Sequence, residues 1–168
     1  MVQTKPQLYT TEEYLELEKK ADHKSEYRDG NVVAITGGTT NHNKLAGTLY
    51  AYLLFALKKL GCNVYIGDVR LWIPQYRQYT YPDVMMMRGQ PLYADDSKTT
   101  VCNPTLIAEV LSKSTQNYDQ GDKFMYYRSI PEIQEYLLID QKQFYVIQHT
   151  KPNLDSGYCL NIEDKQQS

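Results

Sequence analysis

Tyr81-Pro82-Asp83-Val84 and Ile107-Ala108-Glu109-Val110-Leu111-Ser112 are the two stretches that decide the fold, because each places one acidic residue in an apolar, strand-like run. A buried carboxylate without a partner is costly, so it persists where a metal, a cation or a hydrogen-bond network compensates it. Two such carboxylates on adjacent strands can hold one divalent metal between them, as in the Mg²⁺ sites of many nucleases. The two stretches therefore favour phosphodiester hydrolysis as the chemistry.

Each of the two carboxylates also has a structural interpretation. Pro82 lacks an N–H donor and belongs at a strand start, so Asp83 could simply cap the strand entrance by accepting a backbone N–H. Glu109 lies in the middle of a strand, where alternation places it on one face with Ile107 and Leu111. An ion pair with an arginine or lysine is the alternative for Glu109, although a mid-strand carboxylate is also a good candidate for a functional site.

Composition limits the class of protein. The chain has 168 residues, 42% of them hydrophobic, which is enough for one globular domain with a full core. No apolar run approaches the roughly 20 residues of a membrane span, and residues 1–6 contain no apolar segment of a signal peptide. Three scattered cysteines suit a reduced, cytoplasmic compartment, and no paired Cys/His spacing predicts a structural zinc site. We therefore expect a cytoplasmic protein without a membrane segment.

The charge is unevenly distributed along the chain. The formal net charge is −2, which does not by itself indicate a nucleic-acid binder. Residues 31–90, however, carry six basic and only two acidic side chains, whereas residues 130–168 carry three basic and six acidic ones. A local basic face for DNA, formed by residues such as Lys44, Arg70, Arg77 and Arg88, is one interpretation; ordinary solvated charges are the other.

The hydrophobic pattern predicts an α+β fold, α/β/α-like, with helices flanking one mixed sheet. A capping box, Thr10-Thr11-Glu12-Glu13, predicts a helix through about Lys19, and Asp29-Gly30 predicts the turn of a β-hairpin over 25–35. The remaining expected helices cover about 41–60 and 118–128, and the remaining expected strands cover 62–66, 69–73, 82–87, 105–111, 135–139 and 144–148. We expect one domain over 1–168, with its core at about 8–149 and a polar tail over 151–168.

Three further residues are candidates for a site. Glu26 lies just before the Asp-Gly turn, and Lys123 lies four residues after Asp119 on one helix face, where a surface ion pair is the simpler interpretation. A nuclease instead needs a cation near the attacking water. His42 lies near a helix start, where a histidine is more often a cap or a surface residue.

The ordered set of motifs resembles the PD-(D/E)XK nuclease superfamily and, more closely, the Uma-type family of restriction endonucleases. The resemblance covers about residues 8–149, and the matching pieces are Tyr9-Thr10-Thr11-Glu12-Glu13-Tyr14, Ser25-Glu26-Tyr27-Arg28-Asp29-Gly30, His42, Tyr81-Pro82-Asp83-Val84, Ala108-Glu109-Val110-Leu111-Ser112, Tyr118-Asp119-Gln120-Gly121-Asp122-Lys123-Phe124 and Ile130-Pro131-Glu132 through Tyr136-Leu137-Leu138-Ile139-Asp140. It implies a restriction-endonuclease-like core with an N-terminal helix and β-hairpin. In that core Asp83 and Glu109 are metal ligands, Glu26 is the acidic residue of the first motif, and His42 lies beside the site.

The chain departs from the family pattern at three places. The superfamily motif has a lysine two residues after the glutamate, where this chain has Leu111; in the Uma-type family the lysine comes from the following helix, which here implies Lys123. Lys113 stands where the family usually has proline. The usual closing strand and helix have no clear counterpart after Lys151, which predicts an exposed sheet edge.

The leading hypothesis is a Mg²⁺-dependent DNA endonuclease, with Mn²⁺ as a substitute metal. Asp83, Glu109 and the Val110 carbonyl would hold the metal, Lys123 would position the water, and Glu26 would assist the metal or its water. A non-catalytic nucleic-acid-binding or assembly module that keeps the fold is the alternative, favoured by Leu111, by the short C-terminal part expected after Lys151 and by the net negative charge; a small-molecule hydrolase is a third possibility. Cutting both strands of a duplex would favour a two-fold homodimer.

Overall fold

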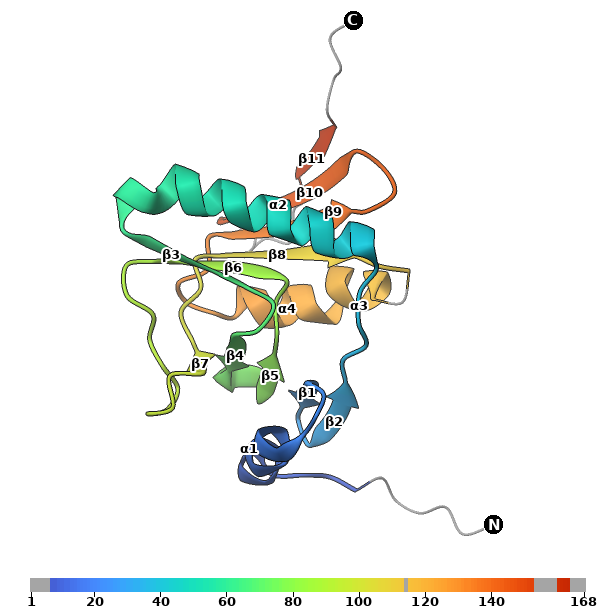
Figure 1. The fold of residues 1–168 in the computed structure, drawn as a ribbon, viewed down its shortest axis with the longest axis vertical. Helices are drawn as coiled ribbons and strands as arrows, with labels where there is room; N and C mark the ends of the chain where they lie inside the picture. The colour runs from blue at the N-terminus through green and yellow to red at the C-terminus, as the bar shows by residue number, and fades with distance from the viewer. Residues whose placement is uncertain (1–6, 114, 153–159, 164–168) are drawn as a thin grey trace, which may run out of the picture.

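The computed structural model describes residues 7–113, 115–152 and 160–163, and its strands form two mixed sheets (Figure 1). The smaller sheet has the order β2-β1-β5-β4-β7. Its strands are β1 (Ser25–Arg28), β2 (Asn31–Ala34), β4 (Arg70–Ile73), β5 (Gln78–Thr80) and β7 (Thr100–Val101). Only β4 and β7 run parallel in this sheet; its other pairs are antiparallel.

The larger sheet has the order β11-β10-β9-β8-β6-β3. Its strands are β3 (Cys62–Ile66), β6 (Val84–Arg88), β8 (Leu106–Leu111), β9 (Glu135–Asp140), β10 (Tyr145–Thr150) and β11 (Leu160–Glu163). The central strand β8 is antiparallel to β6 and parallel to β9. A parallel pair needs a crossover connection, and here α3 (Gln116–Gln120) and α4 (Asp122–Arg128) provide it.

Helices cover both faces of the larger sheet. Figure 1 shows α2 (Thr40–Leu57) and α4 on opposite sides of β6 and β8. The side chains alternate accordingly: Val84 and Met86 pack in the cluster that includes Ala46 and Leu53 of α2. Met85 and Met87 pack in the cluster that includes Tyr127 of α4. Both faces are apolar, which explains why this part of the sequence reads as continuous hydrophobic runs.

The smaller sheet packs against the N-terminal helix α1 (Thr11–Lys20) through tyrosines. Tyr14 of α1, Tyr27 of β1 and Tyr79 of β5 form a buried cluster, and the Tyr14 and Tyr79 rings stack with centroids 5.3 Å apart. The Tyr14 hydroxyl donates to the Ser25 carbonyl at 2.6 Å. Many tyrosines of the chain therefore act as core residues with one satisfied polar atom.

The fold class and the N-terminal elements agree with the sequence-based expectation. Thr10 accepts from the Glu13 N–H while the Glu13 side chain accepts from the Thr10 N–H, which is the predicted capping box. Asp29 and Gly30 have φ of 42° and 100°, as a two-residue hairpin turn with positive φ requires. No helix within the described residues has the length and apolarity that crossing a membrane requires.

Four expectations about the fold were wrong. The strands form two sheets rather than one, since β5 and β7 have only three and two residues and leave no periodicity in the sequence. The helix expected at 118–128 is two helices that meet at Gly121, and the helix expected to reach residue 60 ends at Leu57 and continues as a 3₁₀ turn, Lys58–Leu60. A further 3₁₀ turn, Pro74–Tyr76, joins β4 to β5. Beyond Lys151, where no closing strand was expected, β11 pairs antiparallel with β10.

Candidate active site

Asp83 and Glu109 lie side by side on neighbouring strands. The β6–β8 register pairs Val84 with Ala108, so the residues next to this pair face each other across the strands. The Asp83 N–H donates to Glu109 Oε2 at 3.2 Å, and the Val110 N–H donates to Asp83 Oδ2 at 2.8 Å. Backbone groups of the sheet thus hold both carboxylates in place.

Glu109 is deeply buried. Its side chain is 4% exposed, and its Oε1 accepts from Lys123 Nζ at 3.0 Å and from the Tyr127 hydroxyl at 2.6 Å. Burial raises the pKa of Glu109 to about 8, and nearby Asp83 and Asp119 add to that rise although Lys123 opposes it. The group is therefore short of positive charge, a condition that a divalent cation relieves.

Asp83 is the more accessible carboxylate, with 22% of its side chain exposed. Its Oδ1 lies 2.9 Å from His42 Nε2, and this hydrogen bond raises the pKa of His42 against the opposing effect of burial. The ring is placed by the start of α2, where the His42 N–H donates to the N-cap residue Thr39 at 3.1 Å. His42 therefore contacts the carboxylate pair directly.

Lys123 lies among three carboxylates. Its Nζ is 3.0 Å from Glu109 Oε1, 3.3 Å from Asp119 Oδ1 and 3.6 Å from Glu26 Oε1. Burial alone would lower the pKa of Lys123, but these three acids hold it well above its usual value. The Asp119–Lys123 pair expected on the surface does form, but both residues are buried.

Glu26 reaches the group from β1 of the smaller sheet. Its Oε1 accepts from Thr80 Oγ1 at 2.5 Å, and its Oε2 accepts from Arg28 Nη2 at 2.6 Å and Nε at 3.1 Å. Burial would raise the pKa of Glu26, but Lys123, Thr80 and Arg28 lower it. Within the described part of the chain Glu26 has no direct contact with Asp83 or Glu109, and it is joined to Glu109 through Lys123 alone.

Three residues of the group were not singled out from the sequence: Arg28, Asp119 and Tyr127. Asp119, Lys123 and Tyr127 are spaced by four, which places them on one face of a helical segment. Only the Asp119–Lys123 part of that spacing was used, and it was interpreted as a surface ion pair. Arg28 gave a weaker signal, since only its two-residue offset from Glu26 relates them.

The donor set suits Mg²⁺ in its chemistry. Hard cations take oxygen ligands, and Mg²⁺ is commonly held by one or two carboxylates, with water and substrate phosphate completing its shell. Asp83 and Glu109 offer two adjacent carboxylates. Among the described residues no three His, Cys, Asp or Glu side chains form a ready-made cluster for a metal, so a two-carboxylate site is the arrangement that fits. Val110 contributes its N–H to Asp83, and its carbonyl stays a predicted ligand.

Not all of the residues expected to form a basic face lie at the surface. Arg70 is buried, and its Nε donates to Thr100 Oγ1 at 2.9 Å. Lys44 lies near the first turn of α2, whereas Arg88 pairs with Cys62, beyond the other end of that helix. Arg77 lies 3.4 Å from Asp29 at the hairpin turn. Arg70 therefore does not belong to the expected basic face, and Lys44 and Arg88 lie toward opposite ends of α2.

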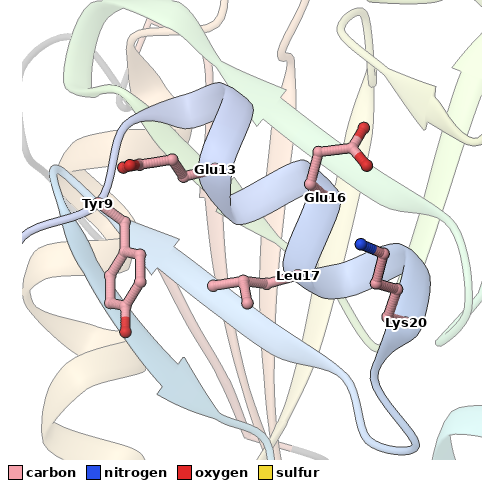
Figure 2. Close-up of a pocket in the computed structure, with 5 residues that line it drawn as sticks. All are labelled: Tyr9, Glu13, Glu16, Leu17 and Lys20. Atoms are coloured by element: carbon pink, nitrogen blue, oxygen red, sulfur yellow. The ribbon is translucent and has the colours of Figure 1, made fainter.

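Two surface pockets lie outside the group formed by Asp83, Glu109 and Lys123. One of about 300 Å³ is bounded by α1 and Tyr9 (Figure 2). Another of about 880 Å³ lies between α1 and the acidic loop that contains Asp95 and Asp96. Neither is lined by Asp83, Glu109 or Lys123, so the chemistry of the buried group, rather than the size of a cavity, marks the candidate site.

Comparisons with known proteins concern the family and the fold of this chain. The model of the Uma2 family, described as "Putative restriction endonuclease", matches residues 11–163. Two uncharacterized proteins of Synechocystis sp. are similar over most of their length: sll1609 is 43% identical over 141 residues (84% of this chain, 80% of the relative), and slr1290 is 36% identical over 154 residues (90% and 79%).

One solved structure has the same fold. A protein of Anabaena variabilis, described as "a putative nuclease belonging to DUF820", aligns with a TM-score of 0.77 over 95% of this chain and 87% of that one. The two sequences are 14% identical, so the likeness concerns the fold.

Proposed function

Since this chain belongs to the Uma2 family, we propose that it is a nuclease that hydrolyses phosphodiester bonds of DNA with Mg²⁺. The observation that carries the proposal is the pairing of Asp83 with Glu109 beside the Lys123 ammonium. Two carboxylates and a cation at one point are what hydrolysis of a phosphodiester needs, because a metal must be held and developing negative charge must be offset.

Each neighbouring residue has a distinct role in the proposed reaction. Asp83 and Glu109 bind the metal, with the Val110 carbonyl as a third oxygen. Lys123 orients the attacking water and offsets the charge of the transition state. Mg²⁺, when bound, polarises the phosphate and favours ionisation of the water.

Other side chains support these groups. Tyr127 and Lys123 fix one oxygen of Glu109, and His42 fixes one oxygen of Asp83, so both carboxylates keep a single orientation. Glu26 acts by holding Lys123, whose Nζ lies 3.6 Å from Glu26 Oε1. Cleavage of both strands of a duplex would require two copies of the site, which a two-fold dimer supplies.

A non-catalytic module that keeps the fold is the second candidate. It is favoured by one observation: all four carboxylate oxygens of Asp83 and Glu109 already have partners without a metal. The two candidates differ in whether a metal displaces these partners.

Metal titration combined with a cleavage assay tests the proposal. Wild-type protein is expected to bind Mn²⁺ or Mg²⁺ by calorimetry and to cut DNA when either is present. Asp83→Asn and Glu109→Gln should each abolish both properties, because each keeps the side-chain shape and removes an anionic ligand. Asp96→Asn is the matched control, an exposed acid outside the site, and should behave as wild type. A wild-type protein that binds neither metal would support the non-catalytic module, and cleavage that persists in both site variants would disprove this site.

A further inference from the structure

Arg28 has an unusual combination of restraint and exposure. It ends β1 two residues after Glu26, so both side chains lie on the same face of that strand. Nε and Nη2 donate to the single oxygen Glu26 Oε2, and the Tyr118 ring lies 3.8 Å from the guanidinium carbon. One edge and one face of the guanidinium are therefore fixed, while 32% of the side chain remains exposed.

Donors on the remaining edge are unused. A guanidinium has five N–H donors, and in the described part of the chain Arg28 makes hydrogen bonds through Nε and Nη2 to Glu26 only. Nη1 therefore has both of its hydrogens available. An arginine held in this way loses little further side-chain freedom when it binds an anion.

The need to neutralise Glu26 does not fully explain why an arginine stands at position 28. Glu26 also accepts from Thr80 and lies 3.6 Å from Lys123, so its charge is compensated from within the protein. Lys123 in turn is 9% exposed and surrounded by three acids, so its ammonium lies inside the site rather than at the surface. Of the two permanent cations in this group, Arg28 is the one that reaches the surface.

The surrounding charge makes such a cation necessary. Four carboxylates, Glu26, Asp83, Glu109 and Asp119, lie within one group, and they repel the phosphates of a nucleic acid. A single metal between Asp83 and Glu109 would offset part of this charge at one point only. A substrate strand needs a second positive contact beside it, and the fork geometry of arginine matches phosphate oxygens.

We propose that Arg28, clamped by Glu26 and Tyr118, binds a non-bridging phosphate oxygen of the nucleic-acid strand that enters the Asp83–Glu109 site. This inference rests on the proposed function, because it names a substrate contact of the same site. It also assigns Glu26 a second role, since the same carboxylate positions both Lys123 and Arg28.

The test separates binding from cleavage. Binding of a short DNA duplex is measured with Ca²⁺ in place of Mg²⁺ for wild type, Arg28→Gln, Arg28→Lys and the control Arg88→Gln. Arg88 is an exposed arginine at the far end of β6 from Asp83. Arg28→Gln is expected to weaken binding by about tenfold or more, and to lower the slope of log affinity against log salt by about one unit. Arg28→Lys should lose less, and Arg88→Gln should match wild type.

The outcomes distinguish this inference from the proposed function. If wild type cuts DNA and Arg28→Gln binds and cuts as wild type does, the inference is wrong and the nuclease stands. If wild type binds DNA without cutting it in Mg²⁺ and Arg28→Gln weakens that binding, Arg28 is a phosphate contact of a non-catalytic module. Equal losses in Arg28→Gln and Arg88→Gln, or no binding by wild type, overturn the inference. Should Arg28→Gln fail to fold by circular dichroism, Arg28→Lys decides: a several-fold loss supports the contact and an unchanged affinity refutes it.

Discussion

The candidate site has two halves that are held in different ways. The strand half consists of Asp83 and Glu109, whose carboxylates accept from backbone N–H groups of the larger sheet. The helix half consists of Asp119, Lys123 and Tyr127, which reach the site through side chains only. Helices α3 and α4 have five and seven residues, too few to be stable alone. The comparison indicates that the sheet fixes the position of the two carboxylates, and that the two short helices supply the cation beside them.

Lys123→Met has the largest expected effect on stability. It tests whether the helix half supplies the positive charge that balances the buried acids. Methionine keeps much of the length of the side chain and removes its charge, leaving three buried acids without their shared cation. Breaking a buried ion pair from one side costs about 3–5 kcal/mol, so the free energy of unfolding in urea should fall by that amount. Lys44→Met, at an exposed position on α2, is the control. A loss below about 1 kcal/mol would mean that solvent already screens the group.

Gly121→Ala tests whether the break between α3 and α4 positions the helix half. A Cβ at this residue would lie 2.9 Å from the Asn117 carbonyl oxygen, so the backbone itself must move. We expect a loss of about 1–3 kcal/mol in thermal or urea unfolding, together with weaker cleavage because Asp119 and Lys123 flank the residue.

The matched control for that substitution is Gly47→Ala in α2. A Cβ there meets nothing within 4 Å, so the helix should gain about 0.5–1 kcal/mol. If both alanines stabilise the protein, the break at Gly121 is not a structural requirement.

Gly38→Ala has the smallest expected effect on stability and tests the strand half through His42. The new Cβ would lie 2.9 Å from His42 Cδ2, a side-chain atom that can move. Stability should change by no more than about 0.5 kcal/mol, while displacement of the ring from Asp83 should lower metal affinity and cleavage. Gly37→Ala, where a Cβ meets nothing within 4 Å, should leave both unchanged. Identical behaviour of the two variants would separate His42 from the function.

Local signals predicted the strand half well and the helix half poorly. Strand alternation correctly put Glu109 on the face of Ile107 and Leu111, because all three lie on the α4 side of the sheet. Asp119 could not be recognised as buried, since its neighbours include Tyr136 of β9, whose hydroxyl donates to the Asp119 carbonyl at 2.9 Å. A contact between segments that are distant in sequence leaves no local pattern.

The same limit explains the errors in the fold. Gln78–Thr80 and Thr100–Val101 are too short for a period of two to be visible, and they are strands because β5 pairs with β1 and β4, and β7 pairs with β4. The expectation that Arg70 belongs to a basic face was wrong for a related reason. Residues that are close in sequence were assumed to share a surface. Arg70 is instead buried, with its guanidinium carbon 5.4 Å from the centre of the Tyr79 ring. Only the tertiary structure shows which short segments pair as strands and which basic residues are buried.

The distribution of the group over two sheets has a consequence for the order in which the chain folds. Glu109 and Lys123 are 14 residues apart and belong to one crossover unit, whereas Glu26 of the smaller sheet and Lys123 are 97 residues apart. The entropy lost on closing a chain segment rises with its length, and contacts between distant residues slow folding. The crossover pair can therefore meet before the smaller sheet docks, and the arginine that Glu26 holds arrives with that last step. Substrate capture would then be the final property that a newly made molecule acquires.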